Sequence, residues 1–547
     1  MASKFSRWDF CILSVLTVLL TWHPYYLHGK LNLFELGLYL PGIEAILQGQ
    51  VPFRDFFYLR GPFELYVPAF LMHIFGTQVA VLETYFYVGT VLTLIVCIAI
   101  AKELYPSRGF LYVMALVLVV RTFPRVVFTF WGGLRYAWGV LSVFCLVRFL
   151  KSGHKGWMAA AGILSAIAFW TSFEIGVSAA IATAGVCVLA LLTGNLPGRF
   201  WKSVFIYAAG FLVVFIPYVW YLAAHQALWP CVQTIAQIAT TMTKNFPEPG
   251  LAPGLGAFLN AVFNPSNPNF RHMTTVYGYV FLVVYLFWKW RRRKLDIADM
   301  GIAAVGFYGL MLYIGAFRNI WASQYEMALQ PWKIVHFFLL MQVWMVIKNS
   351  SLKSRQIIAG VLLAAVALSS VIYSVSRLNK RFFTAKYLSH MLAGKDTSKL
   401  KPLANESTQR LDLPRTQGIV VPLEQAKDLT QLNDFLKTHT ASTDKVLMYP
   451  EMGAVHFIVQ RPWIGRFPTV TLSWLSPQWQ SQWLAEAEAA KPQVAVVLKE
   501  MPEYFENIYF QVPTNRRYFE ENMDYIRRHY QPVSQTSSWT IYERRGQ

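Results

Sequence analysis

The chain has 547 residues, of which 55% are hydrophobic, 16% aromatic and only 14% charged, and its formal net charge is +20. Soluble domains carry about 25% charged residues, and a chain of this length would need several polar domain surfaces. The composition therefore excludes an ordinary soluble enzyme, and the high hydrophobicity excludes disorder. We expect a protein with many membrane spans. The positive charge does not indicate a nucleic-acid partner, because most basic residues of the apolar part lie in short loops, where they set topology.

The charges divide the chain into two parts. Residues 1–374 hold 27 of the 49 Lys and Arg residues and 12 of the 29 Asp and Glu residues, so the last third of the chain carries about half of all charges. We therefore expect a transmembrane part over 1–374 with its first outer loop at 23–78, a connecting segment over 375–416 and a water-exposed domain over 417–547. All five cysteines precede residue 232 and lie in or beside apolar runs, which gives neither a disulfide framework nor a metal-binding pattern.

Apolar runs predict about eleven membrane-spanning helices, since about 20 apolar residues cross a bilayer core of ~30 Å. The runs are 10–22, 79–101, 107–121, 136–150, 157–172, 175–193, 203–224, 274–290, 301–316, 332–348 and 356–374. The first run lacks a small-x-small cleavage site, so we interpret it as a retained span rather than a signal peptide. With the N-terminus in the cytoplasm, 17 basic residues of this part fall inside and 10 outside, which agrees with the positive-inside rule. The C-terminal domain then lies outside.

The outer face carries the long loops and most of the acidic residues of the membrane part. Seven of its twelve acidic residues fall there, and Arg121, Arg125 and Arg135 surround one outer loop against the positive-inside trend. Because these arginines lie on the expected outer side, against that trend, they indicate a binding site for an anionic ligand. The alternative is ordinary snorkelling of long side chains at the interface.

The first outer loop is amphipathic. Residues 33–47 are too polar to span and too apolar for a free loop, which predicts a helix lying in the membrane interface. Gly49 ends that helix, and Gly61-Pro62 begins a second one, since proline suits a first helical position. We interpret Glu44 and Glu64 as residues on solvated helix faces.

The loop residues resemble a known family. The strings are Phe34-Glu35-Leu36-Gly37, Gly49-Gln50-Val51-Pro52-Phe53-Arg54-Asp55-Phe56, Gly61-Pro62 and Tyr66-Val67-Pro68-Ala69. They are similar to the first outer loop of GT-C type membrane glycosyltransferases, in the branch of bacterial protein O-mannosyltransferases and the lipid A aminoarabinose transferase. The resemblance implies an inverting transfer of a sugar from a polyprenyl-phosphate carrier to an acceptor.

Such a reaction needs a carboxylate that removes the acceptor proton and cations that stabilise the departing lipid phosphate, a task that suits arginine. The resemblance makes Glu35 and Asp55 the candidate catalytic residues. Relatives often carry an aspartate directly before the glutamate, where this chain has Phe34, so the base stays open between the two. For Asp55 the alternative is a turn residue paired with Arg54 or Arg60.

The candidate substrate-binding residues are the outer-face arginines and one glutamate in a tight outer turn. They are Arg54, Arg60, Arg121, Arg125, Arg135, Glu174, Arg271 and Arg318. No His-x-x-His or second carboxylate at ligand spacing predicts a metal site, and no cofactor is assigned, although a divalent metal ion stays open.

The last part of the chain reads as a small α/β domain. Strands are expected at 418–422, 445–449, 494–498 and 539–543, and helices at 423–439, 477–490 and 518–530. It contains no glycine-rich phosphate loop and no nucleophile elbow. We expect it to bind the acceptor or to support the membrane part.

The sequence therefore predicts a multi-pass plasma-membrane glycosyltransferase of the cell envelope, whose donor is a polyprenyl-phosphate sugar and whose acceptor is a lipid, glycan or protein. Two alternatives stay open. One is a transporter or flippase of a lipid-linked glycan, which the absence of an internal repeat disfavours. The other is a non-catalytic envelope assembly protein on a GT-C scaffold.

Overall fold

The computed structural model describes residues 7–22, 25–122, 133–194, 200–245, 255–267, 270–316, 327–348, 383–397, 400 and 406–546. Its contacts separate the chain into two compact units. Unit 1 comprises 1–24, 86–217 and 250–400, and unit 2 comprises 25–85, 218–249 and 401–547. The segment 25–85, which contains most of the loop expected on the outer side, therefore groups with the C-terminal part, although more than 300 residues separate them in the sequence.

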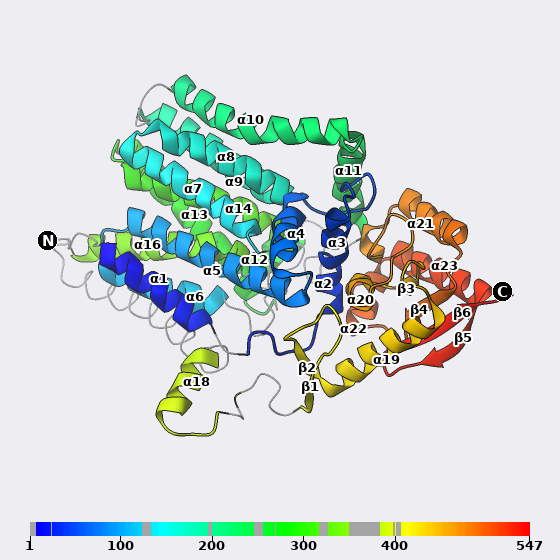
Figure 1. The fold of residues 1–547 in the computed structure, drawn as a ribbon. Helices are drawn as coiled ribbons and strands as arrows, with labels where there is room; N and C mark the ends of the chain where they lie inside the picture. The colour runs from blue at the N-terminus through cyan, green and yellow to red at the C-terminus, as the bar shows by residue number, and fades with distance from the viewer. Residues whose placement is uncertain are drawn as a thin grey trace. The chain divides into compact units, whose positions relative to one another are not determined.

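Within the described residues, unit 1 consists of helices (Figure 1). They are α1 (Arg7–Thr21), α6 (Arg108–Thr122), α7 (Arg135–Ser152), α8 (Lys155–Thr171), α9 (Phe173–Thr193), α12 (Leu255–Phe263), α13 (Phe270–Arg291), α14 (Ile297–Ala316), α16 (Gln330–Lys348) and α18 (Phe383–Leu392), with most of α5 (Val79–Leu104) and α10 (Phe200–Ala224). Helices α7, α8, α9 and α14 run side by side.

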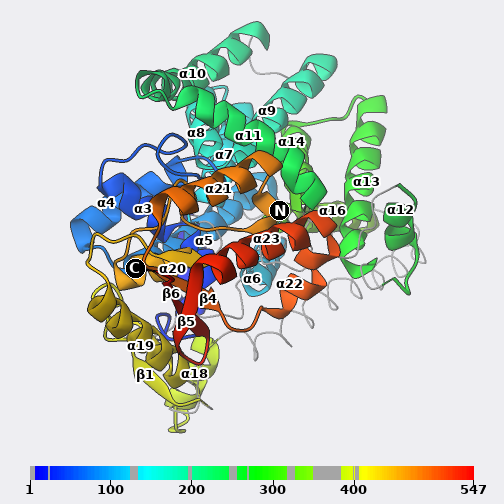
Figure 2. The same cartoon turned by 90° about the vertical axis from the view of Figure 1, so that its right-hand side faces the viewer.

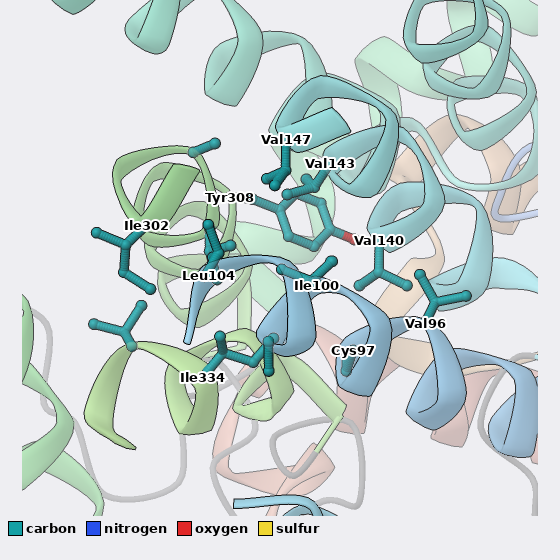
Figure 3. Packing of buried hydrophobic residues seen from close by; sticks show 14 of the residues in the cluster. Val96, Cys97, Ile100, Leu104, Val140, Val143, Val147, Ile302, Tyr308 and Ile334 are labelled. Atoms are coloured by element: carbon teal, nitrogen blue, oxygen red, sulfur yellow. The ribbon is translucent and has the colours of Figure 1, made fainter. Parts of the chain in front are cut away.

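Small residues let these helices approach closely, as is common in membrane bundles. Tyr308 of α14 points between the valines of α7 (Figure 3). A Cβ on Gly139 would lie 2.1 Å from the Tyr308 hydroxyl, so this position needs glycine. Ser142 of α7 and Ser165 of α8 are hydrogen-bonded at 2.8 Å across their interface.

Ten of the eleven apolar runs coincide with a helix, and the run at 356–374 lies outside the described residues. Four described helices are both long and apolar enough to cross a bilayer, by length and composition. They are Val79–Leu104, Phe173–Thr193, Trp201–Ala224 and Ile297–Ala316. The total of eleven spans stays a prediction.

In unit 2 the first loop contains α2 (Leu33–Gly37), α3 (Leu40–Leu47) and α4 (Phe63–Phe75), and α11 (Leu228–Asn245) belongs to the same unit. The single helix expected over 33–47 is two helices. Pro41 lies in the first turn of α3, where its missing N–H costs nothing, whereas further into a helix it would remove a hydrogen bond.

The C-terminal part is an α/β region, as predicted. Its elements are β1 (Thr408–Arg410), β2 (Val420–Pro422), α19 (Leu423–His439), β3 (Leu447–Tyr449), α20 (Gly453–Val459), η3 (Leu472–Trp474), α21 (Pro477–Ala490), β4 (Val494–Leu498), α22 (Glu503–Asn507), η4 (Tyr509–Gln511), α23 (Pro513–His529), β5 (Tyr530–Gln535) and β6 (Trp539–Arg544). The main sheet has the order β3-β4-β6-β5, in which β3 and β4 are parallel and the other pairs antiparallel.

One face of this sheet packs against helices. Ala495 and Val497 of β4 share a buried cluster with Trp483 of α21 and Ile526 of α23. Helix α19 lies on the other side of the sheet from α21 and α23 (Figures 1 and 2). The helix expected to end at Tyr530 ends one residue earlier, because Tyr530 begins β5.

Candidate functional site

Two glycines join the first outer loop to the C-terminal region within unit 2. A Cβ on Gly37, at the end of α2, would lie 2.8 Å from the backbone nitrogen of Ala454, and a Cβ on Gly453 would lie 2.7 Å from the Gly37 carbonyl oxygen. The hydroxyl of Thr469 donates a hydrogen bond to that same carbonyl at 2.7 Å. Helices α2 and α20 therefore touch through their backbones (Figure 1), which fixes the segment that carries Glu35.

Glu35 lies half-buried in the first turn of α2. Its backbone N–H donates to the side chain of Asn32 at 3.1 Å, which caps this short helix. Burial is the largest influence on the pKa of Glu451, of Tyr504 and of Arg60, and the charge of Glu35 adds a smaller raising influence on each of them. Glu35 and Arg60, two residues selected from the sequence, therefore lie within electrostatic reach of each other in unit 2.

Arg60 belongs to a buried hydrogen-bond network. Its Nη1 donates to the Tyr39 hydroxyl at 2.6 Å, and that hydroxyl donates to Glu64 Oε1 at 3.1 Å. Tyr58 donates to Glu64 Oε2 at 2.7 Å, and Arg60 Nη1 lies 3.5 Å from Glu64 Oε1. Because Glu64 is fully buried, this network places a compensated charge pair inside the first loop.

The prediction that Glu44 and Glu64 lie on solvated faces is wrong. Glu64 is enclosed by the network just described. Glu44 is ion-paired with Arg415 at 2.6 Å, and its side chain is 16% exposed. Residues of the C-terminal part cover this loop, which the amphipathic pattern alone could not reveal.

A small recess opens beside Arg60. Its lining comes from α2, from the segment before α4 and from the C-terminal region: Gly37, Leu38, Phe57, Tyr58, Leu59, Arg60, Pro468, Thr469 and Trp474. Phe57 and Trp474 form an aromatic wall, with ring centroids 6.0 Å apart. An arginine beside aromatic rings is a surface suited to a polar ligand with an apolar face.

Glu451 is a buried carboxyl group that sequence reasoning missed. It follows the carboxyl end of β3, is 4% exposed, and has a backbone φ of 55°. Its Oε2 accepts a hydrogen bond from the Tyr504 hydroxyl at 2.5 Å. Burial raises the pKa of Glu451 to about 8. Its position in the sequence could have indicated it, because polar groups that follow the carboxyl ends of parallel strands often form binding sites.

Asp55 lies in the turn between α3 and α4. Both of its oxygens accept hydrogen bonds from Arg54, at 2.8 and 2.7 Å, and Oδ2 also accepts from the backbone N–H of Val51 at 2.7 Å. The hydrogen bond from Arg54 lowers the pKa of Asp55. Arg54 also donates to the carbonyl of His225 at 3.1 Å. This geometry stabilises the turn, and a catalytic role for Asp55 stays a prediction.

In unit 1, two further residues selected from the sequence meet. Arg135, at the start of α7, forms an ion pair with Glu174 in the first turn of α9. The guanidinium carbon lies 5.2 Å from the centroid of the Tyr136 ring. Glu174 and Tyr136 line a second small recess together with Ser178. Arg135 is 3% exposed whereas the Glu174 side chain is 42% exposed.

The structure does not describe the side chains of the remaining selected residues. Arg125 and Arg318 lie outside the described residues, and Arg121 and Arg271 lie on α6 and α13 with side chains that are not described. Within the described residues, no group of three or more His, Cys, Asp or Glu side chains could hold a metal ion.

No protein-family model matches the chain, and no curated protein matches it in sequence. Solved structures match its fold over almost its full length. ArnT from Cupriavidus metallidurans bound to undecaprenyl phosphate is 12% identical, with 97% of each chain covered and a TM-score of 0.52. The apo form of that protein gives 11% identity, 97% and 96% coverage and a TM-score of 0.53.

A third structure extends the comparison beyond ArnT. The oligosaccharyltransferase AglB from Archaeoglobus fulgidus, in complex with an inhibitory peptide and a dolichol-phosphate, is 13% identical. The match covers 98% of this chain and 74% of AglB, with a TM-score of 0.50. Both proteins are GT-C type enzymes. The chain has the GT-C fold. At these identities the likeness shows the fold alone. The resemblance inferred from the residues of the first loop agrees with this fold.

Proposed function

We propose that this GT-C chain is an inverting glycosyltransferase that moves a sugar from a polyprenyl-phosphate carrier to an acceptor on the outer side of the plasma membrane. The observation that carries the proposal is the GT-C fold over 97% of the chain, in a likeness to a protein crystallised with undecaprenyl phosphate. The cluster of Glu35, Arg60 and a neighbouring recess supports it.

In the proposed reaction Glu35 is the general base. The acceptor hydroxyl or amine attacks the anomeric carbon and transfers its proton to Glu35, while the bond from that carbon to the phosphate oxygen breaks and its electron pair leaves with the polyprenyl phosphate. Attack opposite the departing phosphate inverts the anomeric centre. Arg60 is the cation within electrostatic reach of Glu35 that supports this assignment.

We propose Arg135 and Glu174 of unit 1 as residues that contact substrate. They form an ion pair beside Tyr136, and Glu174 is its exposed member. We also propose Arg54, Arg121, Arg125, Arg271 and Arg318 as residues that contact substrate. No metal ion enters the proposed steps.

The proposed topology places the N-terminus in the cytoplasm and the C-terminal α/β region outside. The domain plan that we propose is a transmembrane part over 1–374, a connecting segment over 375–416 and an outer domain over 417–547. The acceptor is a lipid, a glycan or a protein of the cell envelope.

The test is transfer by the purified full-length protein with a panel of polyprenyl-phosphate sugars. Loss of a general base lowers the rate by about 10²- to 10⁴-fold, so we expect Glu35→Gln to reduce kcat by that factor. Asp55→Asn is measured beside it, with Glu424→Gln as a matched control because Glu424 is exposed on α19. Full activity in both Glu35→Gln and Asp55→Asn would overturn this site. Lipid movement across vesicles without sugar transfer would instead support a flippase.

A further inference from the structure

The helix that carries Glu35 is too short to hold its own position. Helix α2 has five residues, and a helix of this length is not stable on its own in water. The loop supplies one cap, the side chain of Asn32, which accepts a hydrogen bond from the backbone N–H of Glu35 at 3.1 Å. The placement of Glu35 therefore depends on contacts that come from elsewhere in unit 2.

Before α2, the side chain of Gln425 on α19 binds the backbone of Leu31. Its Oε1 accepts from the Leu31 N–H at 2.8 Å, and its Nε2 donates to the Leu31 carbonyl at 3.0 Å. One side-chain amide thus satisfies both backbone groups of a buried residue, where an unpaired group would be costly. Two residues earlier, the Gly29 N–H donates to the carbonyl of Val420 on β2 at 2.9 Å.

At the end of α2, the hydroxyl of Thr469 donates to the Gly37 carbonyl at 2.7 Å. The last carbonyls of a helix have no partner within it, so Thr469 supplies a donor that α2 itself lacks. This hydrogen bond is enclosed, because Thr469 is 5% exposed and a Cβ on Gly453 would overlap its hydroxyl. The contact of α2 with α20 therefore leaves room for this hydroxyl only while residue 453 is glycine.

The two contacts lie on either side of Glu35. Leu31 comes four residues before it and Gly37 two residues after it. Both partners, Gln425 and Thr469, belong to the C-terminal α/β region, which lies in the same compact unit as the loop. Each binds backbone atoms through a neutral side chain, so these contacts act on the position of Glu35 and bring no charge to it.

We propose that Gln425 and Thr469 are positioning residues that set the placement of Glu35 for proton transfer, so that the C-terminal α/β region completes the site. This inference rests on the proposed function of Glu35 as the base. A base must lie about 2.6–3.2 Å from the group whose proton it removes, and a displacement of about 1 Å can cost about 10²-fold in rate. Loss of either contact should therefore lower kcat and leave KM nearly unchanged.

The first test is sugar transfer by the purified full-length protein with the panel of polyprenyl-phosphate sugars. Thr469→Val keeps the shape of the side chain and removes its hydroxyl, and we expect kcat to fall roughly 10- to 100-fold. Thr469→Ser keeps the donor and should restore most of the rate, and Gln425→Leu should act like Thr469→Val. Thr430→Val and Gln431→Leu are the matched controls, because both residues are exposed on α19.

A double substitution separates positioning from a general loss of structure. If Thr469 acts through Glu35, then Thr469→Val should change kcat by less than about twofold in a Glu35→Gln background, because the base is already lost. An effect on structure alone would lower kcat by the same factor in both backgrounds. Thermal unfolding in detergent checks that each variant is folded.

The second test needs no activity. Hydrogen exchange of the backbone amides of residues 27–40, measured by mass spectrometry on the full-length protein, reports how often this segment opens. Gln425→Leu leaves the Leu31 N–H without its acceptor, and Thr469→Val releases the end of α2. We expect exchange in this segment to be about 2- to 10-fold faster in both variants, the factor that one lost hydrogen bond gives, and unchanged in the two controls.

The outcomes separate the two proposals. Exchange as slow in Gln425→Leu and Thr469→Val as in the wild type overturns the proposed hold on α2. Faster exchange with an unchanged kcat, or an equal loss of kcat with and without Glu35, overturns the positioning role. Faster exchange in a protein that transfers no sugar from any donor retains the hold on α2 and overturns the proposed glycosyltransferase.

Discussion

The ion pair between Arg60 and Glu64 should be asymmetric in its effect on stability. Glu64 is fully buried and receives two tyrosine hydroxyls, whereas the Arg60 side chain is 14% exposed and reaches the recess. Arg60→Met removes the cation and leaves a buried carboxylate, which typically costs about 3–5 kcal/mol. Glu64→Gln keeps an acceptor oxygen for one of the two tyrosine hydroxyls and leaves a cation that can reach water, so its cost should be about 1–2 kcal/mol.

The assay is thermal unfolding of the full-length protein in detergent, followed by circular dichroism, for both single variants and the double variant. One kcal/mol shifts the Tm by roughly 2–4 °C for a unit of 150–250 residues, so Arg60→Met should unfold several degrees below Glu64→Gln. Because the partners touch, the double variant should lose about 1–3 kcal/mol less than the sum of the single losses. Equal losses in the two single variants, or strictly additive ones, would refute the interpretation of a desolvated and compensated pair.

Three further predictions follow from unit 2. Gly37→Ala places a Cβ against the backbone of α20 and should cost about 1–3 kcal/mol in the same unfolding assay, whereas Gly256→Ala, which meets nothing within 4 Å, should not destabilise. Asp55→Asn should lower the free energy of unfolding by less than about 1 kcal/mol at pH 7. Since the pKa of Asp55 is lowered, the contribution of its carboxylate to stability is present above pH 3.8 and is lost on acidification. The raised pKa of Glu451 has the opposite effect. Relative to Glu451→Gln, the free energy of unfolding of the wild type should fall as the pH rises from 4.5 to about 8, by on the order of 5 kcal/mol in total. A difference in unfolding free energy that does not change with pH would contradict the burial of Glu451 as a neutral acid.

Local patterns predicted local structure well. The expected helices at 423–439 and 477–490 and the expected strand at 494–498 coincide with α19, α21 and β4, because each carries its own periodicity and its own end signals. Helix α20 was not predicted. All seven of its residues are buried, so it has no polar face and its sequence gives no amphipathic period.

The candidate site was only partly accessible from the sequence. Glu35 and Arg60 were selected because they lie in one loop with a recognisable pattern, and Arg135 and Glu174 because they stand out among apolar residues. Glu451 lies more than 400 residues from Glu35 in the chain, and sequence spacing carries no information about a contact made through the backbones of two glycines.

Because only 14% of the residues are charged, each buried glutamate of this chain needs a physical explanation. Two buried glutamates of unit 2 avoid an uncompensated charge in different ways: Glu64 pairs with Arg60, and Glu451 has hydroxyl neighbours and a raised pKa. Arg60→Met and Glu451→Gln separate these two arrangements, because the first substitution strands a buried carboxylate and the second replaces a buried acid by a neutral amide of the same size.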